Sequence, residues 1–471
     1  MRVEANFKLA AAGLVVLALV VTAAWYLGRR MEGSAPVIQI ESPGRFVGRA
    51  FIVKGRVTEK GMGLKSLKIV MASADGKSRD LWNEKFPAPG FRGTGAVMEK
   101  SFAVAVTPVS LGFSDGAATI TVTASDHSYR GWGNGNVAAA AQPVTIDTVP
   151  PVASVLTQAC NVNQGGVGFI IYRLSENTAK DGVLVGDHFF PGHAGLFPNE
   201  PLVHGCFFAV AFNQGPGTPM TVEAVDAAGN KAVFGFPQLI RGKRFHTENF
   251  VLSDRFISTL LPKFPGLKLA PGTPDTPVNR FLAINRDLRR ANYAALTSLG
   301  AKSVPRILWS GAFERMSNAA PKANFADHRV YVYDGKTVDE QDHLGVDLAS
   351  LAQAPVRAAN SGRVVQAGDM GIFGLTVTVD HGFGLLTHDS HLSRIDAKVG
   401  QDVKKGDVLG ASGATGLAGG DHLHYGVIMG DVFVNPIEWW DPHWIKDNVT
   451  GKIAEVAAGF GGKTDVKPQG R

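Results

Sequence analysis

The chain has 471 residues, too many for one ordinary hydrophobic core, and its 45% hydrophobic and 19% charged residues exclude an intrinsically disordered protein. Its 56 glycines and 25 prolines favour many short strands joined by turns over long helices. The formal net charge of +6 suits an anionic partner such as cell wall, lipid or nucleic acid, but the sequence has no dense Lys/Arg tract with interleaved aromatic residues, which argues against nucleic acid.

Residues 1–30 are predicted to form one transmembrane helix. The stretch from Leu9 to Gly28 contains no charged residue, and about 20 apolar residues at a rise of about 1.5 Å each cross the hydrocarbon layer of a bilayer. A cleaved signal peptide is the alternative, although the apolar run is long for one and no small-x-small cleavage pattern follows it. Because no second hydrophobic span is found, we expect the rest of the chain outside the cytoplasm, in the periplasm, held at the inner membrane.

Residues 35–148 and 150–240 are each predicted to form an immunoglobulin-like β-sandwich. Both stretches contain short runs of alternating apolar residues separated by Gly, Ser, Asp and Pro, which is typical of the strands of a small sandwich. An internal echo relates them, because TVTASD at 121–126 recurs as TVEAVD at 221–226. We interpret the two modules as spacers, and wall binding or positioning of the C-terminal domain is the functional alternative.

The two cysteines of the sequence, Cys160 and Cys206, both fall in the second of these modules. They could form one disulfide in an oxidising compartment, or remain two buried thiols that act as small hydrophobic groups. The sequence leaves both alternatives open. The chain has no CxxC pattern, which argues against a cysteine-based zinc site.

Residues 243–324 are predicted to be a helical lead-in to the last domain. SDRFISTLL begins with an N-capping Ser or Asp, and FLAINRDLRRANYAALTSLG is typical of a helix that Gly300 would close. Short strands and glycine turns return over 325–447, and 448–471 form a C-terminal tail. The predicted fold class is therefore mainly β, with one transmembrane helix, two immunoglobulin-like modules, a short helical linker region and a compact C-terminal β-domain.

The segment HLGVD at 343–347 places a histidine and an aspartate four residues apart. In a strand, residues two apart share a face, so His343, Gly345 and Asp347 would point one way and the apolar residues between them into a core. The small Gly345 would leave space for a metal ion bound by both the imidazole and the carboxylate. On a helix the same spacing would also bring the pair together.

The segment HLHY at 422–425 repeats this alternation, with His422 and His424 on one face. Two imidazoles on one strand can serve one metal site, one as a ligand and the other as a neighbouring or catalytic group. Two histidines and one aspartate leave a fourth tetrahedral position for water, which indicates a catalytic rather than a structural zinc site. His391, in HDSHL, would be unremarkable by itself.

These segments belong to a longer series of motifs between Asp342 and Trp440. The series runs HLGVD, APVRAANSGRVV, VDHGFG, SHLS, VKKGDVLGASGATG, GGDHLHYG and VNPIEWW. Over this stretch, about a quarter of the chain, the sequence closely resembles the lysostaphin/LytM-type zinc metallopeptidases, the duplicated hybrid motif peptidases. The resemblance implies a compact β-fold with a narrow groove across the sheet. It also implies that His343, Asp347 and His424 bind one zinc ion and that His391 and His422 are the catalytic histidines.

The activity implied by this resemblance is hydrolysis of peptide bonds in peptidoglycan stem peptides or cross-links. Zinc would lower the pKa of its bound water toward neutrality, and a histidine would carry the water proton to the leaving amine. The alternative is a non-catalytic cell-wall-binding or regulatory protein on the same fold. Because the chain retains all five polar positions, the enzyme is favoured. A third class, a structural surface protein, predicts no zinc.

One position departs from the family's pattern. Many relatives have a tyrosine two residues before the SHL-type histidine and an apolar residue before that tyrosine, whereas this chain has Asp389 and His388. We expect the change to alter substrate fit or the pKa of His391, and we expect an exposed side chain at His388.

Overall fold

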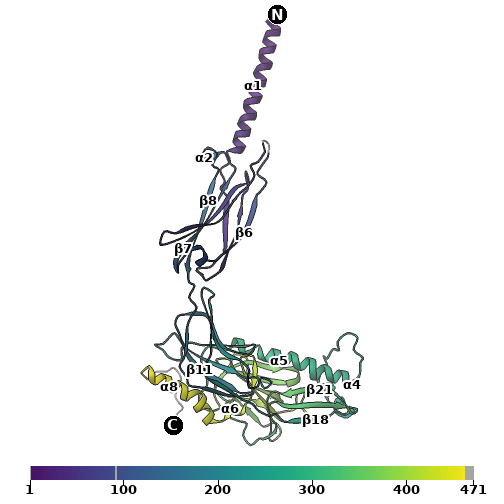
Figure 1. Ribbon diagram of the computed structural model, residues 1–471. Coiled ribbons are helices and arrows are strands. Elements are labelled where there is room, and N and C mark those ends of the chain that lie inside the picture. The colour runs from purple at the N-terminus through teal and green to yellow at the C-terminus, as the bar shows by residue number, and fades with distance from the viewer. Residues whose placement is uncertain (1, 91–92, 462–471) are drawn as a thin grey trace. The chain divides into compact units, whose positions relative to one another are not determined.

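The computed structural model describes residues 2–90 and 93–461 and divides into two compact units (Figure 1). The first unit contains residues 1–150 and 225–230, and the second contains residues 151–224 and 231–471. The last part of the predicted C-terminal tail, 462–471, lies outside the described residues. Each unit is built mainly from β-strands, as the sequence predicts. The assignment of 35–148 and 150–240 to immunoglobulin-like modules stays a prediction.

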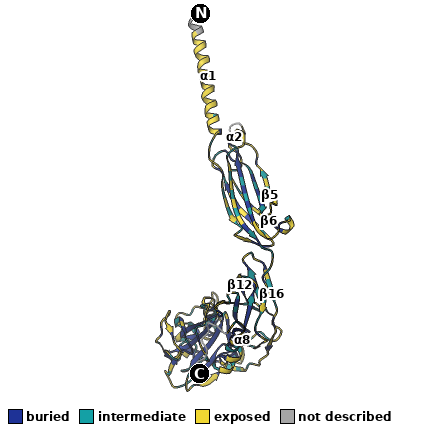
Figure 2. Ribbon diagram, turned by 90° about the vertical axis from the view of Figure 1, so that its left-hand side faces the viewer, coloured by how far each residue is buried: buried dark blue, intermediate teal, exposed yellow. Residues whose placement is uncertain are grey.

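The first unit begins with one long helix, α1 (Arg2–Arg30). Within the described residues it is the one helix long and apolar enough to cross a membrane, a property that an N-terminal signal sequence shares. Figure 2 shows the described part of this helix almost entirely exposed within this unit, and Arg30 at its end is buried. An apolar surface of this extent is stable in lipid rather than in water.

Two β-sheets enclose the core of the first unit. One has the strand order β1-β3-β6 and the other the order β2-β8-β7-β4-β5. Alternate apolar residues of both sheets fill the space between them, among them Val53 and Val57 from β3 and Ile120 and Val122 from β7. The elements are β1 (Val37–Ser42), β2 (Phe46–Val47), β3 (Phe51–Thr58), β4 (Leu64–Ser73), β5 (Ser78–Lys85), β6 (Glu99–Val106), η1 (Val109–Leu111), β7 (Gly116–Asp126), α2 (Arg130–Gly133) and β8 (Val137–Ile146).

The two related segments, 121–126 and 221–226, form the same local structure. Asp126 ends β7 and accepts hydrogen bonds from the backbone and side-chain amides of Asn136. Asp226 ends β15 (Met220–Asp226) and accepts the same two kinds of hydrogen bond from Asn230. In both places an aspartate at a strand end therefore holds the loop that follows it.

The second unit begins with three small sheets, of orders β14-β11-β9, β13-β12-β15-β16 and β10-β17. Cys160 and Cys206 are free thiols buried in its core, so of the two alternatives the structure shows the reduced pair. The remaining strands are β9 (Ala153–Val155), β10 (Cys160–Asn163), β11 (Val167–Leu174), β12 (Thr178–Val185), β13 (His188–Pro191), β14 (Val203–Ala209), β16 (Lys231–Phe234) and β17 (Gln238–Arg241).

The predicted helical lead-in contains helices and also two strands. Ser253 caps α3 by accepting a hydrogen bond from the backbone N–H of Phe256, as predicted. The prediction that Gly300 closes the second helix is wrong, because that helical run ends at Thr297. A Cβ at Gly300 would lie 1.8 Å from the carbonyl oxygen of Gly430, so the glycine allows two backbones to approach. The elements are β18 (Thr247–Val251), α3 (Asp254–Leu260), η2 (Leu261–Lys263), α4 (Pro277–Leu282), η3 (Ala283–Leu288), α5 (Arg289–Thr297), η4 (Gly300–Lys302) and β19 (Ala320–Ala323).

The last part of the chain forms an eight-stranded sheet in the order β19-β22-β30-β26-β25-β24-β28, with β31 paired to β30. Two three-stranded sheets, β18-β20-β21 and β23-β29-β27, accompany it. The elements are β20 (Asp327–Tyr333), β21 (Lys336–His343), β22 (Val346–Ala349), β23 (Pro355–Arg357), β24 (Gly362–Asp369), η5 (Gly371–Phe373), β25 (Leu375–Gly382), β26 (Leu385–Leu392), β27 (Arg394–Ile395), β28 (Asp402–Val403), β29 (Val408–Ala411), β30 (Leu423–Met429), β31 (Val432–Val434), α6 (Ile437–Trp440), α7 (Pro442–Ile445), η6 (Lys446–Thr450) and α8 (Gly451–Gly459).

The register of three neighbouring strands decides which side chains share a face of this sheet. Asp347 on β22 pairs with His424 on β30, and His424 pairs with Ser390 on β26. Asp389 instead pairs with Tyr425, so these two lie on the opposite face. The sheet therefore has one face that carries Asp347 and His424 and a second face that carries Asp389.

Candidate metal centre

Three donor atoms from three strands meet at one point, which we call the donor triangle. The Nε2 atom of His343 lies 2.9 Å from the Oδ1 atom of Asp347 and 2.9 Å from the Nδ1 atom of His424. The third side, between His424 Nδ1 and Asp347 Oδ1, is also 2.9 Å. All three residues are buried. The structure therefore brings together the three residues for which the sequence predicts a shared metal ion.

The chain bends between His343 and Asp347. The prediction of one continuous strand here is wrong, because β21 ends at His343 and β22 begins at Val346 in another sheet. A Cβ at Gly345 would lie 2.5 Å from the imidazole of His424. Glycine is thus needed at this position, and the space that it leaves is filled by the third donor residue.

The tautomer of His343 is fixed by its surroundings. Its Nδ1 atom lies 2.9 Å from the carbonyl oxygen of Asn324, and a carbonyl only accepts, so Nδ1 carries a proton and the neutral ring has its lone pair on Nε2. This lone pair faces a carboxylate oxygen and a second imidazole nitrogen. Electron-rich atoms at this separation repel unless a cation or proton lies between them. Two imidazole nitrogens and one carboxylate oxygen are the donors of an open zinc site, so the residues fit that ion.

Opposing effects act on the carboxylate of the donor triangle. Burial by itself would raise the pKa of Asp347, but the adjacent imidazoles of His343 and His424 hold that pKa well below its usual range. A guanidinium lies nearby, with Nη2 of Arg329 at 3.7 Å from Asp347 Oδ2. Burial lowers the pKa of His424 to about 4. Both donors are therefore held in the deprotonated forms that bind a cation.

The two predicted catalytic histidines lie beside the donor triangle. The ring centroid of His391 is 4.8 Å from that of His422 and 5.7 Å from that of His424. Nδ1 of His391 donates to the carbonyl of Thr415 over 2.9 Å, and Nδ1 of His422 donates to the carbonyl of Gly420 over 2.8 Å. In both rings Nε2 is therefore the nitrogen available for proton transfer, and in His422 it lies 3.6 Å from Asp347 Oδ1.

A local break in strand β26 gives His391 its position. Regular alternation would place His391 on the same face as Asp389, away from His424. The register between β25 and β26 shifts next to Thr376, and His391 adopts a left-handed backbone conformation with φ of 63°. Such bulges re-aim a side chain next to functional sites. Burial and the neighbouring His424 and His422 rings hold the pKa of His391 well below its usual range.

The sequence did not indicate several side chains around the donor triangle. A cavity of about 330 Å³ opens onto it, and its wall includes Arg329, Tyr331, Glu248 and Phe250. Arg329 Nε donates to Glu248 Oε1 over 2.8 Å and so joins β20 to β18. The alternation of Arg329, Tyr331 and Tyr333 along β20 is the signal that could have identified this strand as a wall of the site.

His388 is not exposed, so that expectation is wrong. Its ring is fully buried and lies 5.4 Å from that of His424 and 5.1 Å from that of Phe373, measured between centroids. Ser390 Oγ lies 3.0 Å from its Nδ1. A Cβ at Gly426 would lie 1.9 Å from its Nε2, so the glycine opposite leaves the space that the ring occupies. The residue is packed beneath the donor triangle because β26 is buried on both faces.

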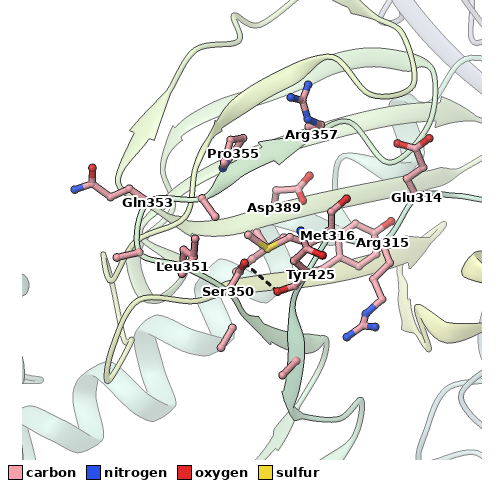
Figure 3. A pocket seen from close by; sticks show the side chains of 17 residues that line it. Glu314, Arg315, Met316, Ser350, Leu351, Gln353, Pro355, Arg357, Asp389 and Tyr425 are labelled. Carbon is pink, nitrogen blue, oxygen red and sulfur yellow. Dashed lines mark hydrogen bonds between the residues drawn. The ribbon is translucent and has the colours of Figure 1, made fainter.

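Asp389 lies on the other face of the sheet. It contributes to the wall of a cavity of about 750 Å³ with Tyr425, Arg315 and Arg357, and Figure 3 shows its carboxyl group among these side chains. Its Oδ2 atom is buried and has no hydrogen-bond partner among the described residues. Burial raises the pKa of Asp389 to about 8. The departure from the family's pattern thus places a carboxyl group on the face of the sheet opposite the donor triangle.

Comparison with known families identifies the domain that holds the donor triangle. Residues 341–436 match the model described as peptidase family M23, so the chain carries a domain of this family. The resemblance predicted from the sequence motifs is thereby confirmed.

Named relatives match over this domain. The DD-carboxypeptidase/endopeptidase Mpg of Neisseria meningitidis is 37% identical over 95 residues, which are 20% of this chain and 22% of the relative. The peptidoglycan DD-endopeptidase ShyA of Vibrio cholerae is 39% identical over 87 residues, 18% of this chain and 20% of the relative. The glycyl-glycine endopeptidase ALE-1 of Staphylococcus capitis is 36% identical over 91 residues, 18% of this chain and 24% of the relative. The chain thus spans about a fifth to a quarter of these relatives.

Similar solved structures include a catalytic domain and a longer chain. The catalytic domain of lysostaphin from Staphylococcus simulans is 26% identical with a TM-score of 0.23, covering 28% of this chain and 98% of that domain. A zinc-containing peptidase from Vibrio cholerae is 13% identical with a TM-score of 0.25, covering 87% of this chain and 90% of that one.

Proposed function

We propose that this protein is a zinc-dependent endopeptidase that hydrolyses peptide bonds in peptidoglycan stem peptides or cross-links. The observation that carries the proposal is the donor triangle of His343, Asp347 and His424, with the rings of His391 and His422 beside it. A wall-binding protein would need neither three converging donors nor two histidines with fixed tautomers. The names of the relatives that match over the same domain support peptidoglycan as the substrate.

In the proposed mechanism, His343, Asp347 and His424 hold one zinc ion. When bound, the ion supplies Lewis acidity, which polarises a carbonyl and lowers the pKa of water toward neutrality. Asn324 supports this arrangement from outside, because its carbonyl accepts the Nδ1 proton of His343 and keeps Nε2 turned inward.

His391 and His422 move protons in this mechanism. Water attacks the carbonyl carbon of the scissile peptide bond, and one imidazole Nε2 takes the water proton. The C–N bond then breaks, and the same proton passes to the leaving amine nitrogen. The second histidine donates a hydrogen bond to the oxyanion that forms on the carbonyl oxygen. Both rings have Nδ1 tied to a backbone carbonyl, so Nε2 is the reacting nitrogen in each. The ring that takes the water proton starts neutral, and the ring that donates to the oxyanion must carry a proton on Nε2.

The proposed location is outside the cytoplasm, in the periplasm, with residues 1–30 as a membrane anchor. The apolar helix α1 supports the anchor. Peptidoglycan is the proposed partner of the catalytic domain, and the modules at 35–148 and 150–240 are the proposed spacers. Relatives from Neisseria and Vibrio named as DD-enzymes favour directly linked stem peptides over glycine bridges as the substrate.

The test is digestion of purified sacculi by the zinc-loaded full chain in detergent, with the released fragments identified by mass. We expect cross-linked muropeptide dimers to be converted to monomers, each conversion adding one water across a peptide bond. Protein stripped of metal is the matched control. Binding to sacculi without a change in the muropeptide profile would contradict the proposal and support a wall-binding role.

A further inference from the structure

Three carboxylates lie close together at one end of the two sheets of the first unit, and we call them the acidic cluster. Glu32 follows helix α1, Glu59 follows β3, and Asp126 ends β7. One oxygen of each lies within 4.8 Å of the other two. Glu59 is 4% exposed and Asp126 is 0% exposed, while Glu32 is half-buried. Three like charges at this separation repel one another strongly when they are shielded from water.

Only one of the two carboxylate oxygens of Glu59 is hydrogen-bonded among the described residues. Its Oε1 atom accepts a hydrogen bond of 2.6 Å from the backbone N–H of Gly61. Its Oε2 atom is buried and has no hydrogen-bond partner among the described residues. A buried carboxylate oxygen without a partner is costly and rare in proteins. Its position beside two other carboxylates makes a missing positively charged ligand the simplest explanation.

Neutral groups hold the Asp126 carboxylate and the backbone of Glu32 in place. Asp126 accepts hydrogen bonds from the backbone N–H groups of Ser128 and Asn136 and from Nδ2 of Asn136. Nδ2 of Asn136 also donates to the backbone carbonyl of Glu32 over 3.0 Å. A Cβ at Gly61 would lie 2.3 Å from Cδ of Glu32, so this glycine makes room for the Glu32 side chain. All of these hydrogen bonds come from uncharged groups.

The pKa values of two of these carboxyl groups are raised, as expected for carboxylates that repel one another. Burial and the nearby Asp126 carboxylate raise the pKa of Glu32, and burial with the neighbouring Asp126 and Glu32 carboxylates raises that of Glu59. A cation that neutralises the acidic cluster would relieve the same repulsion.

We propose that Glu32, Glu59 and Asp126 bind one Ca²⁺ ion. The donors are all oxygens, which favours a hard cation over zinc, whose protein ligands are mostly nitrogen and sulfur. Ca²⁺ accepts six to eight oxygens in irregular geometry, whereas Mg²⁺ demands a near-ideal octahedron. An irregular group of three carboxylates in a loop region suits Ca²⁺. Sites of this kind in extracellular modules bind Ca²⁺ with Kd values of about 10⁻⁴–10⁻³ M.

The ion would join two parts of the first unit. Glu32 lies two residues beyond the end of α1, whereas Glu59 directly follows a strand of one sheet and Asp126 ends a strand of the other. A shared ion would therefore fix the segment that leaves the helix against the β-domain. Without Ca²⁺, repulsion among the carboxylates would loosen this connection.

The test is isothermal titration of Ca²⁺ into the zinc-loaded full chain in detergent, in buffer freed of divalent ions. We expect wild type to bind one more Ca²⁺ than Glu59→Gln, with a Kd of about 10⁻⁴–10⁻³ M. Glu41→Gln is the matched control, because Glu41 is an exposed glutamate on β1 outside the acidic cluster. It should bind as wild type does. Mg²⁺ titrated in place of Ca²⁺ should bind at least tenfold more weakly.

Thermal unfolding gives a second measurement that does not depend on how well one variant folds. Ca²⁺ should raise the unfolding temperature of wild type and Glu41→Gln but not that of Glu59→Gln or Glu32→Gln. Without Ca²⁺, Glu59→Gln should be at least as stable as wild type, because one repelling charge is gone. Equal Ca²⁺ binding by wild type and both cluster variants, or no saturable binding by wild type up to about 10 mM, ten times the weaker expected Kd, would overturn the proposal.

Discussion

The donor triangle and the acidic cluster each gather three buried side chains, but they differ in their donor atoms and in what surrounds them. The donor triangle combines two imidazole nitrogens with one carboxylate oxygen, and Asn324 fixes the tautomer of one ring. The acidic cluster offers oxygens alone, and neutral amides position them. The first set suits zinc and the second suits Ca²⁺. Charge explains the contrast: the triangle carries one formal negative charge and the cluster three.

The pKa values of two buried aspartates show that the immediate neighbours of a carboxyl group decide whether it is ionised. Asp347 and Asp389 lie on opposite faces of the same sheet, and burial acts to raise the pKa of both. In Asp347 the adjacent imidazoles reverse this effect, whereas in Asp389 burial acts without a compensating partner. A buried carboxyl group beside imidazoles stays ionised and can bind a cation. A buried carboxyl group without such neighbours stays protonated and neutral.

The largest expected effect is that of removing the carboxylate from the donor triangle. Asp347→Ala should reduce zinc from about one ion per chain to nearly none and abolish sacculus hydrolysis, because two imidazoles alone make a poor site. Asp402→Asn, at an exposed position on β28 of the same domain, is the control. Metal analysis of both purified variants checks this. Stoichiometric zinc in Asp347→Ala would contradict the assignment of this ligand.

The next effect separates zinc binding from proton transfer. His422→Ala should keep its zinc but lose about 10²–10⁴-fold in turnover, the usual contribution of a general acid or base. His443→Ala, at an exposed histidine of the same unit, should behave as wild type. Muropeptide release at saturating sacculi measures the rate. An unchanged rate in His422→Ala would remove this residue from the mechanism.

A smaller effect should distinguish the two ion sites by stability and activity together. With free Ca²⁺ at about 100 times its Kd, linkage predicts about 2.7 kcal/mol of added stability for the first unit. A Ca²⁺-selective chelator should remove this gain and leave hydrolysis of a soluble cross-linked muropeptide unchanged. Calorimetry and the hydrolysis assay on the same sample check both halves. Loss of hydrolysis on removing Ca²⁺ would show that the two sites are not independent.

The smallest expected effect is on the pH dependence of stability, through Asp389 on the face of the sheet opposite the donor triangle. Because burial raises the pKa of Asp389 to about 8, its folded form stays protonated while the unfolded form ionises near pH 3.9. Its contribution to stability is therefore fully present below about pH 4 and is lost as pH rises toward 8. Asp389→Asn should flatten this part of the stability profile, as measured by denaturant unfolding at pH 5 and pH 8. Parallel profiles for wild type and variant would argue against a buried neutral carboxyl group.

Sequence reasoning reached the donor triangle because its residues lie in short local patterns and because the family resemblance selected His424 from the two histidines of HLHY. HLGVD places a histidine and an aspartate close together in the chain, and a bend rather than one strand brings them together. The pairing of Asp347 with His424 completes the set. The mainly β character followed from alternating apolar runs and turn residues. Both features depend on near neighbours along the chain, which a sequence displays directly.

The parts that sequence reasoning missed depend on contacts between distant segments. His388 was expected to be exposed because nothing in its neighbourhood shows that β26 is buried on both faces. Arg329 comes from another sheet and reaches the site only through the pairing of β18, β20 and β21. The acidic cluster joins residues 32, 59 and 126, which share no motif. Such groupings are set by tertiary packing and carry no local period.

The most direct test of the donor triangle is zinc-edge X-ray absorption spectroscopy on the purified full chain. Zinc held by His343, Asp347 and His424 predicts nitrogen and oxygen neighbours at about 2.0–2.2 Å with the outer-shell scattering of two imidazoles. A sulfur shell at about 2.3 Å would place the ion at Cys160 or Cys206 instead, and that result would contradict the account.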